Sequence, residues 1–260
     1  MSNDLLYEVR DGIAHATLNR PQARNALTPE MYDGLARVAG EIAADATIRA
    51  LVIRGAGDKA FASGSEISQF LAFKGGADGV SYERHLDEVL NALECCPKPV
   101  IAAISGACTG GGAAIAAVCD LRIGTRSARI GVPVARTLGN CLSIASLSRF
   151  VSLIGAARTT EMMLTGRLIE ADDAKALGFL NEVVDGIEAL DARVDELARS
   201  VAALAPLTLR ATKEQMRRMR AATIAALNDD DLVAMCYGSE DFRQGVEAFV
   251  ARRAPEWKGR

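Results

Sequence analysis

The sequence predicts an α/β fold in which short apolar strands, glycine-containing turns and helices alternate, followed by a mainly helical region. Two segments indicate this most clearly. The strand-like run Ala50–Arg54 ends at Gly55, and the strand-like run Val100–Ile104 leads through Gly110-Gly111-Gly112 into an apolar helix. Half of the 260 residues are hydrophobic and 24% are charged, which suits one large globular domain, or a domain with an appendage, around a sizeable core.

A hairpin and a helix are expected first along the chain. The alternating runs Leu5–Val9 and Ile13–Leu18 flank Arg10-Asp11-Gly12, and Asp-Gly between two such runs is typical of a β-hairpin turn. A helix is then predicted from Thr28, as its N-cap, to about Ala44, because a proline occupies the first helical position and apolar residues recur on one face.

The middle of the chain repeats the order of strand, turn and helix. A second turn of small residues, Ser63-Gly64-Ser65, precedes a short helical segment at Ile67–Phe70. Gly75–Gly79 indicates a mobile loop, and Tyr82–Leu93 is amphipathic with a helical period. Further strands are expected at residues 100–104, 121–124 and, from a weaker pattern, 129–131. The predicted C-terminal helices cover residues 143–153, 156–164, 171–177, 190–205, 206–226 and 239–253.

The stretch Pro97–Asp120 carries the clearest chemical pattern. A buried strand, a turn with three consecutive glycines and a helix start would aim backbone N–H groups at an anion. The missing side chains at Gly110-Gly111-Gly112 would let a ligand approach the backbone closely. The alternative is that these glycines serve only a turn and close helix packing.

Composition and charge exclude several classes of protein. The net charge of −3 gives no global reason to expect nucleic acid as a partner. The first residues lack a basic region followed by an apolar one, so we expect no secretory signal and a cytoplasmic protein. The uncharged run inside Lys98–Asp120 is interrupted by glycines, so we expect no membrane span. Six cysteines without a C-x-x-C spacing and only two histidines predict free thiols and no metal site.

Several separated motifs span nearly the whole chain. They are Leu18-Asn19-Arg20-Pro21, Arg24-Asn25-Ala26-Leu27, Phe61-Ala62-Ser63-Gly64-Ser65-Glu66, Lys98-Pro99-Val100-Ile101-Ala102 with Gly106, Gly110-Gly111-Gly112 and Cys119-Asp120, Leu164-Thr165-Gly166-Arg167, Gly178-Phe179-Leu180-Asn181-Glu182-Val183-Val184, and Glu240-Asp241-Phe242 through Arg253-Ala254-Pro255-Glu256-Trp257. Together they resemble the signatures of the crotonase superfamily, also called the enoyl-CoA hydratase/isomerase family.

The resemblance implies a crotonase-type spiral of ββα units with a C-terminal helical region. We expect the spiral core in residues 1–200 and a helical trimerisation region in residues 201–260, assembled as a homotrimer or as a hexamer made of two trimers. The resemblance also implies an acyl-CoA thioester as the substrate, with coenzyme A as part of that substrate and no other cofactor. The backbone N–H groups of Ser65 and Gly111 match the two donors with which the family binds the thioester oxygen.

The sequence departs from the family where hydratases carry two glutamates. The matching positions hold Ala114 and Val134, which cannot transfer protons, so we do not expect ordinary hydration, and the carboxylate typical of the isomerases is missing too. The two N–H donors would still polarise a thioester. Thioester hydrolysis, decarboxylation and C–C bond cleavage therefore remain as alternative reactions, and a non-catalytic acyl-CoA binder as an alternative function.

Acid–base groups must then come from elsewhere. Asn140, Cys141 and Ser143 occupy a segment where other family members place alternative catalytic groups, and His85 has a suitable ordinary pKa in a segment with Tyr82 and Glu83 that commonly walls the acyl pocket. The structural alternatives are a turn for Asn140, a buried small side chain for Cys141, a helix N-cap for Ser143 and a surface position for His85.

The resemblance also implies where coenzyme A would bind. Arg24, Lys59 and the main chain around Ala62, Ser63 and Gly64 match the usual positions, and cations suit the 3′-phosphate. Both cations could equally be solvated loop charges. Glu66 and Asp120 are expected to have structural roles.

Overall fold

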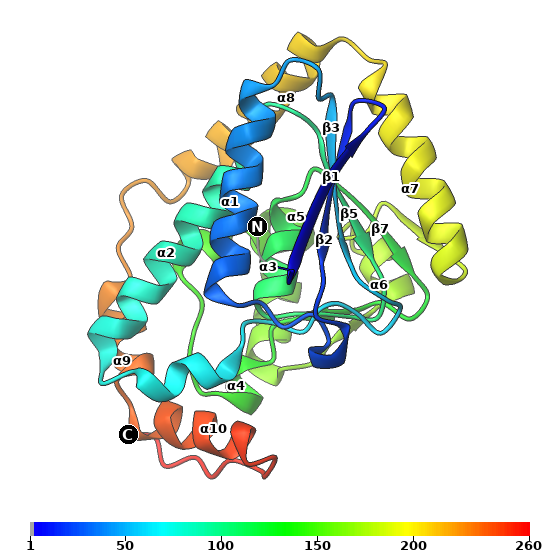
Figure 1. The fold of residues 1–260 in the computed structure, drawn as a ribbon. Helices are drawn as coiled ribbons and strands as arrows, with labels where there is room; N and C mark the ends of the chain where they lie inside the picture. Colours follow the sequence, from blue (N-terminus) through cyan, green and yellow to red (C-terminus); the bar gives the residue numbers. More distant parts are fainter. Residues whose placement is uncertain (1–2) are drawn as a thin grey trace.

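A computed structural model describes residues 3–260 and has the predicted α/β architecture (Figure 1). Met1 and Ser2, which begin the segment considered as a secretory signal, lie outside the described residues. The strands are β1 Leu5–Arg10, β2 Ile13–Leu18, β3 Ala50–Gly55, β4 Ala60–Ala62, β5 Val100–Ile104, β6 Ala107–Thr109, β7 Leu121–Thr125, β8 Arg129–Gly131, β9 Ile169–Glu170 and β10 Glu182–Val184. The α-helices are α1 Pro29–Ala44, α2 Gly76–Glu94, α3 Gly111–Val118, α4 Val134–Thr137, α5 Ile144–Thr165, α6 Ala171–Ala176, α7 Gly186–Ala202, α8 Pro206–Ala222, α9 Asp230–Tyr237 and α10 Glu240–Val250.

The strands of the spiral are divided between two sheets. A six-stranded sheet has the order β1-β2-β3-β5-β7-β10, and a four-stranded sheet has the order β4-β6-β8-β9. Each turn adds one strand to the large sheet and the next to the small one, as with β3 and β4, β5 and β6, and β7 and β8. Helices α2 and α3 end the first two of these turns, so the predicted spiral of ββα units is confirmed.

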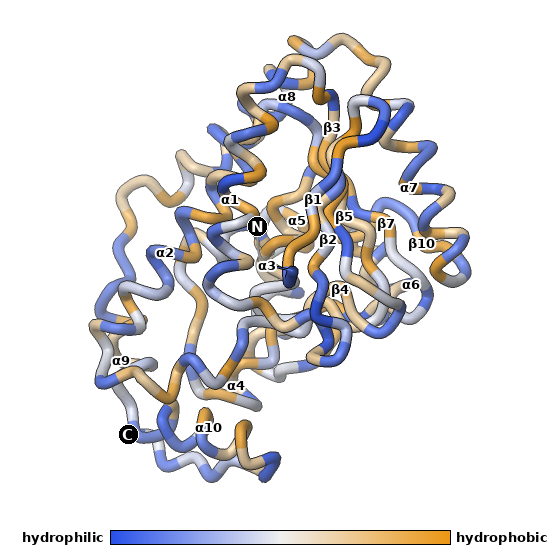
Figure 2. The backbone as a smooth tube through the Cα atoms, viewed as in Figure 1, coloured by the Kyte–Doolittle hydropathy of each residue, from blue (hydrophilic) through white to orange (hydrophobic). Residues whose placement is uncertain are grey.

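Apolar side chains fill the spaces on both faces of the large sheet. Figure 2 shows hydrophobic residues concentrated along the central strands. The main core includes every residue of α3 from Ala113 to Val118. On the other face α7 packs Leu190 and Val194 against the strands (Figure 1). The boundary predicted at residue 200 lies inside α7.

Polar side chains fix the carboxyl end of α3 and join it to α8. Arg122, only 4% exposed, donates hydrogen bonds to the carbonyl oxygens of Ala116 and Cys119 at the end of α3. Asp120 accepts hydrogen bonds from the Val100 N–H at 2.7 Å and from the Lys213 ammonium of α8. The structural role predicted for Asp120 is therefore confirmed.

Most predicted elements are confirmed within a few residues. Thr28 caps α1 by accepting a hydrogen bond from the Met31 N–H. The two helices predicted at residues 143–153 and 156–164 meet at Gly155, whose φ of 75° breaks α5. Helix α7 begins at Gly186, four residues earlier than predicted, and α8 ends at Ala222. Within residues 3–260 no helix has the length and apolar character to cross a membrane, and all six cysteines are free thiols.

The mobile loop predicted at Gly75–Gly79 is wrong. Helix α2 begins at Gly76, and α9, which sequence patterns missed, packs directly on its first turns (Figure 1). A methyl group on Gly76 would lie 2.3 Å from the Ala234 carbonyl oxygen, and one on Gly79 would lie 2.2 Å from the Tyr237 ring. These glycines therefore allow close helix packing rather than loop motion.

We expect Gly79→Ala to lower the free energy of unfolding by about 1–3 kcal/mol, because the contact with Tyr237 outweighs the better helix propensity of alanine. The matched control is Gly40→Ala in α1, where an added methyl group would have no heavy atom within 4 Å. That variant should gain about 0.5–1 kcal/mol. Urea denaturation measures both, and equal stabilisation of the two variants would contradict close packing of α2 on α9.

Candidate active site

The two small-residue turns lie side by side. They follow β4 and β6, which are neighbours in parallel pairing, with Ala62 opposite Cys108. Gly64 has a φ of 109°, and a methyl group there would lie 3.9 Å from both the Gly110 Cα and the Gly111 nitrogen. A methyl group on Gly112 would lie 2.4 Å from the Ala62 carbonyl oxygen. The positive φ at Gly64 and the close contact at Gly112 each favour glycine where the two loops meet.

Among the described residues, the backbone N–H groups of Ser65 and Gly111 donate no hydrogen bond. Leu27 pairs with the chain on both sides of Ser65, donating to the Gly64 carbonyl and accepting from the Glu66 N–H, each at 2.8 Å. Gly111 is the first residue of α3, where an N–H has no partner inside the helix. Within residues 3–260 neither N–H has a hydrogen-bond acceptor. Two donors from adjacent turns can bind one oxygen that carries negative charge.

Two tyrosines surround the Ser65 side chain. Its hydroxyl is 2.9 Å from the Tyr32 hydroxyl and 2.6 Å from the Tyr82 hydroxyl. A methyl group on Gly111 would lie 1.9 Å from the Tyr32 oxygen, so Tyr32 closes one side of the site. Burial raises the pKa of both tyrosines, which keeps the phenols protonated and able to donate. Tyr32 was not predicted, although it lies on the predicted helix 28–44.

A polar scaffold holds the first turn. The Asn25 side chain, fully buried, donates to the Ala60 carbonyl at 2.7 Å and accepts from the Arg20 N–H at 3.0 Å. The Arg20 guanidinium donates to the Ala26 carbonyl at 2.8 Å and pairs with Glu66 at 3.0 Å. This accounts for the structural role predicted for Glu66, through an ion pair rather than a helix cap.

A buried carboxylate lies next to Tyr82 in α2. Glu83 is 3% exposed, and its oxygens accept hydrogen bonds from the Tyr237 hydroxyl at 2.5 Å and the Ser143 N–H at 3.2 Å. Burial raises the Glu83 pKa to about 7, although both hydrogen bonds oppose this change. Sequence reasoning placed Glu83 in a pocket-wall segment but did not select it, because its ordinary pKa gave no signal.

The four acid–base candidates have different surroundings. Asn140 donates to the Tyr237 hydroxyl at 2.8 Å and so joins the Glu83 group. The hydrogen bond with Cys236, and then burial, raise the Cys141 pKa, so this thiol keeps its proton at neutral pH. Ser143 caps α5 by accepting a hydrogen bond from the Ser146 N–H, as its structural alternative predicted. His85 is exposed and pairs with Asp33 of α1 at 2.9 Å, with no hydrogen bond to either turn.

The residues predicted to bind coenzyme A lie around the first turn. The Ser63 N–H donates to the Arg24 carbonyl at 3.0 Å, which joins Arg24 to the segment Ala62, Ser63 and Gly64. Lys59 precedes β4, and its carbonyl accepts from the Ala107 N–H at 3.0 Å. Both side chains are exposed, and neither forms an ion pair within residues 3–260. Their charges are therefore available to an anion.

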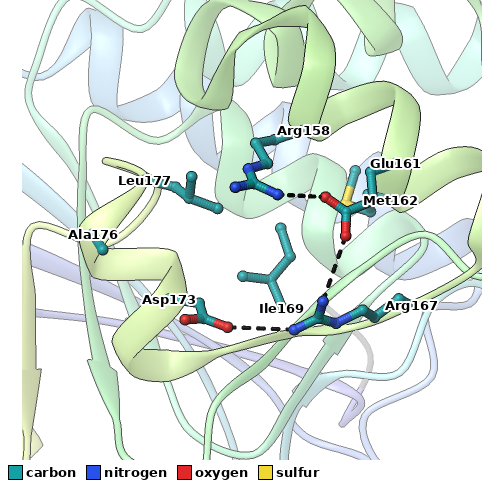
Figure 3. Close-up of a pocket in the computed structure, with 8 residues that line it drawn as sticks. All are labelled: Arg158, Glu161, Met162, Arg167, Ile169, Asp173, Ala176 and Leu177. Carbon is teal, nitrogen blue, oxygen red and sulfur yellow. Dashed lines mark hydrogen bonds and ion pairs between the residues drawn. The ribbon is translucent and has the colours of Figure 1, made fainter.

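A separate cavity of about 350 Å³ lies between α5 and α6 (Figure 3). Its charged groups neutralise one another: Glu161 pairs with Arg158 at 2.7 Å and with Arg167 at 3.4 Å, and Arg167 also pairs with Asp173. None of the residues lining it belongs to the two turns or to the predicted site.

Comparisons with known proteins indicate the family of this chain. A family model described as enoyl-CoA hydratase/isomerase matches residues 8–260. The chain is 31% identical to the short-chain-enoyl-CoA hydratase of Clostridium acetobutylicum over 256 residues, 98% of this chain and 97% of that protein. A crystal structure of an enoyl-CoA hydratase/carnithine racemase from Magnetospirillum magneticum is 34% identical with a TM-score of 0.81, over 100% of this chain and 97% of that one. Methylmalonyl-CoA decarboxylase in complex with 2-nitronate-propionyl-CoA is 25% identical with a TM-score of 0.88, over 98% of each chain. The chain therefore belongs to the enoyl-CoA hydratase/isomerase family, within the crotonase superfamily.

Proposed function

We propose that the protein activates an acyl-CoA thioester by binding its carbonyl oxygen between the Ser65 and Gly111 N–H groups. The observation that supports this most is the adjacency of two turns whose N–H donors have no acceptor within residues 3–260. Removing the α-proton, or breaking a bond at the α-carbon, moves negative charge onto the thioester oxygen. Preorganised donors stabilise that charge more than they stabilise the neutral carbonyl. Arg24 and Lys59 would bind the phosphates of coenzyme A.

The proposed reaction is enolate chemistry other than the hydration of a double bond. Ala114 is 1% exposed in the apolar core and Val134 packs against it, so neither position supplies a carboxylate to activate water. Decarboxylation needs only the donors to form the enolate, since the breaking C–C bond supplies its electron pair. The likeness to methylmalonyl-CoA decarboxylase favours this alternative. C–C bond cleavage remains a further member of the same proposal. Thioester hydrolysis remains an alternative, because the same donors would bind the oxygen of a tetrahedral intermediate.

We expect negligible hydration of crotonyl-CoA, because both glutamate positions are apolar. The loss of the enoyl absorbance measures this reaction, and the double variant Ala114→Glu with Val134→Glu is the matched comparison. Brisk hydration by the unchanged protein would contradict the argument from Ala114 and Val134.

A non-catalytic acyl-CoA binder would differ from an enzyme because it would bind acyl-CoAs without converting them. Calorimetric titration with acetyl-CoA tests binding of the thioester, and mass spectrometry of a panel of acyl-CoAs after incubation tests conversion. Binding without any conversion across the panel would favour the binder. The absence of binding would overturn the proposed function as a whole.

We also propose assembly through the C-terminal helices, as a trimer or a hexamer. Helix α8 has no fully buried residue, and Leu207, Met216 and Met219 along it are 76%, 63% and 68% exposed. Apolar side chains gathered on one helix favour an interface between subunits. The mass of the particle in solution measures its subunit number.

A further inference from the structure

Glu83 is a buried carboxylate whose charge no cation neutralises. It forms no ion pair within residues 3–260, and Arg149, another buried residue, pairs instead with Asp87 at 3.1 Å and Glu94 at 3.4 Å. Removing an unpaired carboxylate from water is unfavourable. A glutamine would accept a hydrogen bond at the same place without that cost. A buried titratable group that the fold does not require in its charged form is a candidate for proton transfer.

The hydrogen-bond chain from Glu83 ends at the Asn140 amide. Tyr237 donates to Glu83 at 2.5 Å and accepts from the Asn140 amide at 2.8 Å. The Asn140 Oδ1 atom is buried and has no partner among the described residues. Buried polar atoms in proteins are almost always hydrogen-bonded. The acceptor is therefore a place where an ordered water or a ligand can donate a hydrogen bond.

Tyr82 connects the carboxylate to the two turns. It precedes Glu83 in α2, and its hydroxyl is 2.6 Å from the Ser65 hydroxyl, next to the proposed oxyanion donors. The rings of Tyr82 and Tyr237 pack with their centres 6.2 Å apart. The pair of Tyr237 with Glu83 and the pair of Tyr82 with Ser65 thus meet where the two tyrosine rings pack on each other and on Phe70.

We propose that Glu83 exchanges a proton with the α-carbon of the acyl group, a role that rests on the proposed thioester site. The carboxylate removes the α-proton, and the C–H bonding pair becomes the carbon–carbon double bond of the enolate. The carbonyl π pair moves to the oxygen held by the Ser65 and Gly111 N–H groups. Returning the proton from the Glu83 carboxyl to carbon reverses each change, so no further reactant is consumed.

The surroundings of Glu83 suit transfer in both directions near neutral pH. Burial raises its pKa to about 7, the hydrogen bonds from Tyr237 and Ser143 lower it, and the charges of Asp87 and Asp229 raise it. A group that is ionised in part at the working pH can both accept and return a proton. The other titratable groups of this region are Tyr32, Tyr82, Tyr237 and Cys141, whose raised pKa values keep them neutral at pH 7, and Cys236, whose pKa the hydrogen bond with Cys141 lowers to about 7.

Exchange of the α-protons of propionyl-CoA in deuterated water tests the proposal. Proton NMR follows the loss of the α-methylene signal, and calorimetry measures binding of the same thioester. We expect the unchanged protein to exchange these protons, with a rate that rises with pH and levels off above an apparent pKa near 7. Glu83→Gln should lower the rate at least about 100-fold while binding changes little. Glu88→Gln, an exposed position on the same helix, is the matched control and should exchange as the unchanged protein does.

A second variant separates proton transfer from a structural role. Tyr237→Phe removes a hydrogen bond that lowers the Glu83 pKa, so the midpoint of the rate profile should move to higher pH. Exchange by Glu83→Gln at the unchanged rate, or a profile that Tyr237→Phe does not move, would overturn the role of Glu83 and leave thioester binding intact. If the unchanged protein bound propionyl-CoA without exchanging its α-protons, the role of Glu83 would also be overturned and thioester binding would stay intact. Failure to bind propionyl-CoA would overturn the thioester site itself.

Discussion

Gly111→Pro, made together with Tyr32→Phe, should lower the turnover of an acyl-CoA about 100- to 1000-fold relative to Tyr32→Phe alone, the usual effect of removing one oxyanion donor. Proline lacks the N–H that Gly111 offers, and its fixed φ suits the first position of a helix. No hydrogen bond within residues 3–260 is lost, because that N–H has no acceptor there. The phenylalanine is needed because a side chain at position 111 would meet the Tyr32 oxygen at 1.9 Å.

Gly111→Ala in the same Tyr32→Phe background is the matched control. It adds a Cβ at the same place but keeps the N–H, and without the hydroxyl its closest neighbours are the Tyr32 ring at 3.2 Å and the Ser65 hydroxyl at 3.3 Å. We expect the alanine variant to keep most of the turnover, so the difference between the two variants reports the loss of the N–H together with the proline ring carbon that takes its place. Equal turnover of the proline and alanine variants, measured under single-turnover conditions, would show that the Gly111 N–H does not stabilise the transition state.

The fold was predictable where local rules act strongly. The Asp-Gly hairpin, the Thr28-Pro29 helix start and the strand Val100–Ile104 each depend on neighbouring residues, and each is confirmed. Strands β4 and β6 contain three residues each, too few for a periodic pattern, yet they bring the two turns together. The glycines of α2 misled the prediction, because their purpose is contact with α9, a partner more than 150 residues away in sequence.

The candidate site could be predicted from the sequence only in part. The turns at Ser65 and Gly111 could be predicted from small residues after strands, because a turn is encoded locally. The carboxylate at Glu83 could not, because its unusual pKa arises from burial among α2, α9 and the Ser143 segment. His85 is of the residue type expected of an acid–base group, but it lies at the surface beside Asp33. Residue type alone therefore favours histidine as the acid–base group, whereas burial can raise the pKa of a glutamate into the same range.

Arg122→Met should lower the free energy of unfolding by about 3–5 kcal/mol, since it leaves several buried carbonyl groups without donors. The Arg122 side chain donates to the Phe179 carbonyl at 2.5 Å as well as to two carbonyls at the end of α3, and its guanidinium lies 5.5 Å from the Phe179 ring. A cation at the carboxyl end of a helix is also favoured by the helix dipole. Methionine keeps the length and apolar stem of arginine and removes only these interactions. A melting temperature lower by about 10 °C would follow.

Arg126→Met provides the matched control one residue beyond the same strand. Its side chain is 64% exposed and pairs with Asp172 and Asp185 at the surface, where ion pairs contribute little, so this variant should unfold almost as the unchanged protein does. Guanidinium denaturation compares the two. Because α3 carries Gly111 at its other end, loosening its carboxyl end should also weaken acyl-CoA binding, which calorimetry with acetyl-CoA measures. If both variants unfolded at the same denaturant concentration, water would have to satisfy the carbonyls of α3, and the position of Gly111 would not depend on Arg122.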